Sequence, residues 1–67
     1  MVSLPQLRRD LVEIENHLRL TRNRLACYQV LAEAELIAHT ERVIAGLEST
    51  KELLAVRIQS VTDEKVH

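Results

Sequence analysis

The amino-acid sequence predicts an all-α protein, a helical hairpin that assembles into an oligomeric bundle or coiled coil. The first observation is that residues 6–45 contain neither glycine nor proline, the two strongest helix breakers. The second is a heptad pattern of apolar residues in the N-terminal half. The third is the composition, which is 46% apolar and 28% charged and includes a single aromatic residue, Tyr28.

The first expected element is one long helix over about residues 4–45. Pro5 stands in the first turn of this helix, and Gly46 directly follows it, which is where the two residue types usually occur. Ser3 and Gln6 have the spacing of a capping box. Such a helix would be about 63 Å long at 1.5 Å per residue. Its apolar stripe therefore needs partners.

The apolar stripe of this helix forms a heptad seam, with residues at alternating steps of three and four. The seam consists of Leu4, Leu7, Leu11, Ile14, Leu18, Thr21, Leu25 and Tyr28. A second apolar stripe follows, made of Cys27, Leu31, Ala34, Ala38 and Ala45. A helix that is apolar on two sides has neighbours on both. We expect the seam without Thr21, together with Leu31, Ala34 and Ala38, to form the interface.

The second expected element is a short return helix over about residues 50–62. Gly46 offers a C-terminal cap to the long helix, and Ser49 and Glu52 repeat the capping-box spacing. Folded back, the short helix would lie against residues 31–45. The alternative is one continuous helix through Gly46, at a cost of about 1 kcal/mol relative to alanine.

The charge is unevenly divided along the chain, although the net charge is only −1. Residues 1–30 carry five arginines and three acidic residues, whereas residues 31–67 carry four basic and seven acidic residues. A chain with a basic half and an acidic half favours antiparallel association of those halves. We therefore expect two long helices to pair antiparallel about a centre near residue 26. Leu and Ile at the seam leave dimer and tetramer open, and the pairing direction is not settled by them.

Several classes of function are disfavoured by composition. No apolar run approaches the 18 residues of a membrane span, and the N-terminus does not have the pattern of a secretory signal, so we expect a cytoplasmic protein. Cys27 is the only cysteine, which excludes an intrachain disulfide and a cysteine-based zinc site. The net charge gives no general attraction to nucleic acid or membranes.

Two Glu–His pairs have the spacing of neighbours on one helix face, namely Glu13 with His17 and Glu35 with His39. A dimer centred near residue 26 could bring the four side chains together as a divalent-metal site. The simpler interpretation is two surface pairs beside the seam. We expect neither a metal nor a cofactor.

His39 also suggests an alternative function. The segment 38–42, AHTER, resembles the dimerisation box of histidine kinases, and this resemblance implies a phosphoacceptor histidine on a long helix. The sequence departs from the box at residues 43–44, where Val-Ile replaces the family's proline. A third hypothesis is a small nucleic-acid-binding regulator that uses the arginines of residues 1–30, although only Tyr28 could stack on a base.

The favoured hypothesis is a non-enzymatic assembly module made of one domain, residues 1–67. No phosphate-binding glycine loop and no catalytic constellation occurs in the sequence, so we expect no enzymatic activity. The module would self-associate and bind a partner helix, as an adaptor, a small chaperone or an accessory subunit. In size and shape it is similar to the helical-hairpin co-chaperones of type III secretion.

Overall fold

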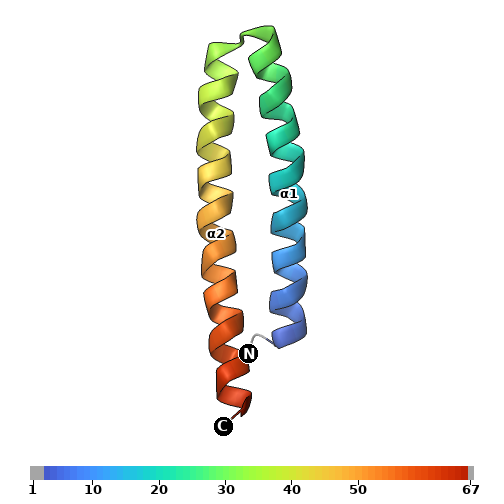
Figure 1. The fold of residues 1–67 in the computed structure, drawn as a ribbon, viewed down its shortest axis with the longest axis vertical. Helices are drawn as coiled ribbons and strands as arrows, with labels where there is room; N and C mark the ends of the chain where they lie inside the picture. Colours follow the sequence, from blue (N-terminus) through green and yellow to red (C-terminus); the bar gives the residue numbers. More distant parts are fainter. Residues whose placement is uncertain (1–2, 67) are drawn as a thin grey trace.

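Two antiparallel helices joined by a tight turn make up the computed structural model, which describes residues 3–66. Helix α1 spans Leu4–Leu31 and helix α2 spans Ala34–Val66. The two helices lie side by side, with the turn at one end and the start of α1 near the end of α2 at the other (Figure 1). The hairpin measures 52 × 17 × 14 Å.

Helix α1 begins where the sequence predicts it. Ser3 is extended, with φ −87° and ψ 154°, and its hydroxyl oxygen accepts a hydrogen bond from the backbone N–H of Gln6 at 3.3 Å. Pro5 occupies the first turn, where its missing N–H costs nothing. The Gln6 side chain does not reach back to Ser3. It donates to the Asp10 carboxylate at 2.9 Å instead.

Helix α1 ends in a Schellman motif at Ala32. The N–H of Ala32 donates to the carbonyl of Gln29 at 3.2 Å, and the N–H of Glu33 donates to the carbonyl of Tyr28 at 3.1 Å. Ala32 has φ 57° and ψ 37°, the left-handed conformation that glycine usually supplies at this position. The carbonyl of Glu33 accepts from the N–H of Ile37 at 2.9 Å, which starts α2.

The expected hairpin of two helices is confirmed, but the expected boundaries are wrong. The chain reverses at Ala32–Glu33, so no helix spans 4–45 and no separate return helix spans 50–62. Gly46 lies inside α2, where a Cβ added to it would have no neighbour within 4 Å. Antiparallel pairing occurs within the chain, about the turn, and the 4–45 helices that were expected to pair about residue 26 do not form.

The predicted α1 seam is the buried side of α1. Leu7 and Leu18 are 2% exposed, Thr21 is 6% exposed, and the other seam residues are half-buried. Helix α2 presents a matching heptad pattern, with one exposed member, Lys51. Its positions are Ile37, Thr40, Ile44, Leu47, Lys51, Leu54, Ile58 and Val61. Counted outward from the turn, Tyr28 stands level with Ile37 and Leu4 stands level with Val61.

Candidate interaction surface

The predicted interface residues divide into two groups. The seam residues Leu4, Leu7, Leu11, Ile14, Leu18, Leu25 and Tyr28 lie between α1 and α2 of the same chain. Leu31, Ala34 and Ala38 are exposed, because they flank the turn and the outer side of α2. Ala34 and Ala38 do not pack against residues 50–62, since all of these residues belong to α2, and Leu31 is the last residue of α1. A role for either group between chains stays a prediction.

Two lateral faces flank the seam, and they differ in chemistry. On the first, which we call the charged face, Arg22 and Glu48 form an ion pair at 2.9 Å. Glu15 lies on the same face and approaches the Lys51 ammonium at 3.9 Å. Three of these side chains directly follow a seam position in the sequence, and Lys51 occupies one. Charged residues beside a seam commonly pair across two helices. The charged face is therefore already partnered within the chain.

The second face, which we call the apolar face, lies on the opposite side of the seam. Its apolar members lie at the heptad positions on that side of the seam, and they are Leu20, Cys27, Leu31, Leu36, Val43, Gly46 and Leu53. The same side also carries Asp10, Glu13, Arg24 and Arg57. The four leucines remain 42–72% exposed. The sequence analysis did not identify this face as a whole. Which residues of α1 and α2 lie on the same side of the hairpin becomes known only once the seam positions of α2 are known.

A small pocket lies on the apolar face, in the half of the hairpin near the turn. It has a volume of about 140 Å³ and combines polar side chains from both helices with apolar ones. It is lined by His17, Thr21, Arg24, Tyr28, Leu36, His39, Thr40 and Val43. Thr21 and Thr40 are both 6% exposed, and the Thr21 hydroxyl donates to the carbonyl of His17 at 2.7 Å. Two buried threonines of the seam therefore border this pocket.

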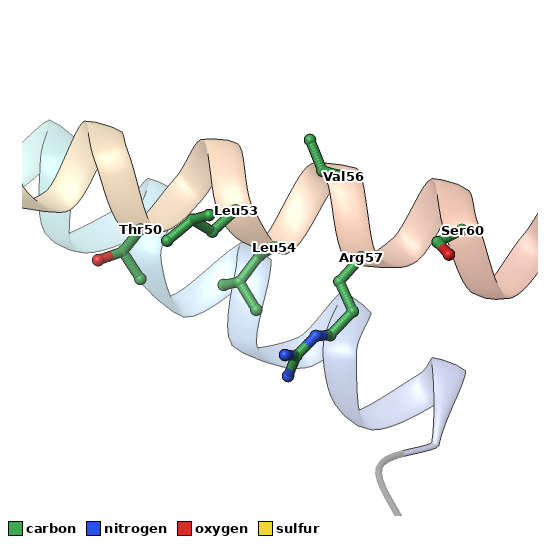
Figure 2. Close-up of a pocket in the computed structure, with 6 residues that line it drawn as sticks. All are labelled: Thr50, Leu53, Leu54, Val56, Arg57 and Ser60. Carbon is green, nitrogen blue, oxygen red and sulfur yellow. The ribbon is translucent and has the colours of Figure 1, made fainter.

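A larger hollow of about 490 Å³ lies along α2, nearer the open end of the hairpin. It is lined by Thr50, Leu53, Leu54, Val56, Arg57 and Ser60. Figure 2 shows Leu54 and Arg57 reaching toward α1, whereas Val56 points away from it. Leu53 is 72% exposed and Val56 is 64% exposed. This hollow extends the apolar face beyond the small pocket.

The two histidines singled out in the sequence both line the small pocket, but without their glutamates. His17 and His39 line it, whereas Glu13 and Glu35 do not. Within residues 3–66, no three or more His, Cys, Asp or Glu side chains lie close enough to hold a metal ion. The hypothetical metal site is therefore not formed within one chain.

Two arginines of α1 lie on different faces. Arg22 pairs with Glu48 on the charged face, whereas Arg24 lines the small pocket on the apolar face. A nucleic-acid-binding protein usually clusters its basic residues on one face. The nucleic-acid hypothesis stays a prediction.

No protein-family model, curated protein or solved structure matches this chain. Its class is given by the fold itself, an antiparallel two-helix hairpin with one charged and one apolar lateral face. Neither helix, over the part of the chain that the structure describes, combines the length and apolar character of a membrane span.

Proposed function

We propose that this chain is a non-enzymatic helical assembly module. It acts by self-association and by binding a partner helix, in the role of a cytoplasmic adaptor, small chaperone or accessory subunit. The observation that carries this proposal is the surface that the hairpin leaves uncovered, since two helices alone cannot enclose a core.

The accessible surface is large for the mass of the chain. It amounts to 5331 Å² for 7.7 kDa. A compact monomer of that mass exposes about 4,300 Å² by the usual scaling. The hairpin thus exposes roughly 1,000 Å² more than a compact monomer does. In this proposal another protein chain covers this surface.

The core of the hairpin is correspondingly thin. Among the described residues, Leu7 and Leu18 are the apolar side chains that reach full burial. Domains of this size are marginally stable unless they are cross-linked, bind a metal or oligomerise. The single cysteine leaves association as the stabilising route that fits the composition.

The exposed apolar residues are the side chains that such an association would bury. Seven large ones are 42–86% exposed, namely Val12, Leu20, Val30, Leu31, Leu36, Leu53 and Val56. Single exposed apolar residues are ordinary, but contiguous ones mark interaction sites. Most of these residues lie on the apolar face or at its border, which favours binding of another helix there.

Sedimentation equilibrium from micromolar to millimolar concentration tests the proposal. We expect the mass to rise from the 7.7 kDa of one chain to at least twice that value. Circular dichroism on the same samples would show whether helix content is maintained. A constant monomer mass with full helix content would overturn self-association.

A further inference from the structure

We propose that the apolar face is a self-association interface, and that its occupant is the apolar face of a second copy, giving a four-helix bundle. This inference rests on the proposed function and names its surface and its partner. Four-helix bundles bury inward-facing side chains from neighbouring helices in this way.

The side chains on the two lateral faces favour the apolar face as the dimer interface. Burying the charged face would remove water from the Arg22–Glu48 ion pair, whose side chains are 57% and 53% exposed. No ion pair between the described side chains lies on the apolar face, where Leu36 and Leu53 are uncharged. Their burial removes apolar area from water, which is the main driving force of association.

The amount of uncovered surface fits one further copy. A stable interface of standard size buries about 800 Å² on each partner. The hairpin exposes roughly 1,000 Å² more than a compact monomer of its mass. One face-to-face contact with a second hairpin would therefore cover most of the excess surface.

The charges on the apolar face allow it to meet a copy of itself. Asp10 and Glu13 lie there toward the open end, with Arg57, and Arg24 lies nearer the turn. Two acidic and two basic side chains give the face no net charge. A two-fold dimer places the same patch on both partners, so a strongly charged face would repel its copy.

Gly46 provides space for close packing on this face. It lies in the middle part of α2, and a Cβ added at this position would have no neighbour within 4 Å. A glycine within a helix costs about 1 kcal/mol relative to alanine. Because glycine has no side chain, a second helix can approach closely at this position, as it does at small residues in other helix–helix contacts.

The test compares two apolar-to-glutamate substitutions on opposite faces. Leu53→Glu changes the apolar face at a side chain that is 72% exposed, and Val12→Glu is the matched control beside the charged face, at 54% exposure. Glutamate is a good helix former, so both variants should keep the hairpin. Circular dichroism at equal concentration checks that they do.

Sedimentation equilibrium then measures the dissociation constant of each dimer. We expect Leu53→Glu to raise it at least about a hundredfold, because a two-fold dimer contains each substitution twice. Val12→Glu should change it less than about threefold. Leu36→Glu, on the same face but near the turn, should repeat the result of Leu53→Glu.

Three results would overturn the inference. An equal effect of Val12→Glu and Leu53→Glu would mean that no single face forms the dimer. A larger effect of Val12→Glu would place the interface on the charged side while leaving the assembly function intact. A wild-type protein that stays monomeric at millimolar concentration would remove both this interface and the self-association on which it rests.

Discussion

The turn at Ala32 and the helix around Gly46 differ in a way that reverses the usual roles of their residue types. Ala32, which has a Cβ, takes the left-handed conformation, with φ 57°. Gly46, which has none, continues a regular α-helix. A left-handed conformation costs a residue with a Cβ about 1–2 kcal/mol, and a glycine inside a helix costs about 1 kcal/mol. Both positions are therefore locally unfavourable.

The difference shows that long-range packing places the chain reversal. A turn after Leu31 gives every seam residue of α1 a counterpart at the same level of α2, down to Leu4 beside Val61. A turn at Gly46 would leave the N-terminal half of the seam facing water, because a return helix of about 20 Å would be too short to reach it. Burying one leucine or isoleucine contributes about 1.5–3 kcal/mol, so a few such residues exceed the local cost at Ala32.

The largest expected effect comes from breaking the seam itself. Leu18→Ala removes a side chain that is 2% exposed, and it should lower the free energy of unfolding by about 2–5 kcal/mol. Urea denaturation followed by circular dichroism measures the change. Val30→Ala, at a side chain 86% exposed, is the control and should change stability by less than about 0.5 kcal/mol. Equal losses for the two variants would mean that the seam does not hold the hairpin together.

Exchanging the two residues sharpens the comparison without changing the composition. Ala32→Gly should relieve the left-handed strain, and Gly46→Ala should improve helix propensity, each by about 1 kcal/mol. Ala32 lies in the turn and Gly46 lies well inside α2, so the two effects should add and the double variant should gain about 2 kcal/mol. Thermal unfolding of the dilute monomer measures it. Destabilisation by Ala32→Gly would contradict the left-handed turn.

The smallest expected effect concerns the Arg22–Glu48 ion pair on the charged face. Arg22 and Glu48 are both about half exposed, so solvent weakens their attraction. A double-mutant cycle with Arg22→Ala and Glu48→Ala should give a coupling energy of about 0.5 kcal/mol, which added salt reduces. A salt-independent coupling above about 2 kcal/mol would show that this pair, as well as the seam, fixes the register.

The sequence predicts the local features of this fold well and the long-range ones poorly. The cap at Ser3 and the α1 seam depend on neighbouring residues, and both are confirmed. The break was expected at Gly46 because glycine and the Ser49–Glu52 spacing are local signals, whereas the true break depends on the pairing of residues far apart. The heptad pattern from Ile37 to Val61 indicates which residues of α2 pair with α1, but Lys51 interrupts the apolar residues of that pattern.

The candidate interaction surface illustrates the same limit. Neither Leu36 nor Leu53 belongs to the interface that the sequence predicts, since each lies beside the heptad positions of α2. Their common side becomes evident only when the seam of α2 is set against that of α1. Leu31, by contrast, was predicted as an interface residue from its position after the first seam, and it lies exposed on the apolar face.

The position of the turn also implies an order of folding. Tyr28 and Ile37, next to the turn, are close in sequence, so pairing them closes only a short loop, whereas Leu4 and Val61 are separated by most of the chain. The entropy cost of loop closure grows with loop length, and each pair that forms shortens the loop left for the next. We therefore expect the hairpin to form from the turn outward. Leu7 would join late, and its loss would mainly accelerate unfolding, whereas strain at Ala32 would slow the first step of folding.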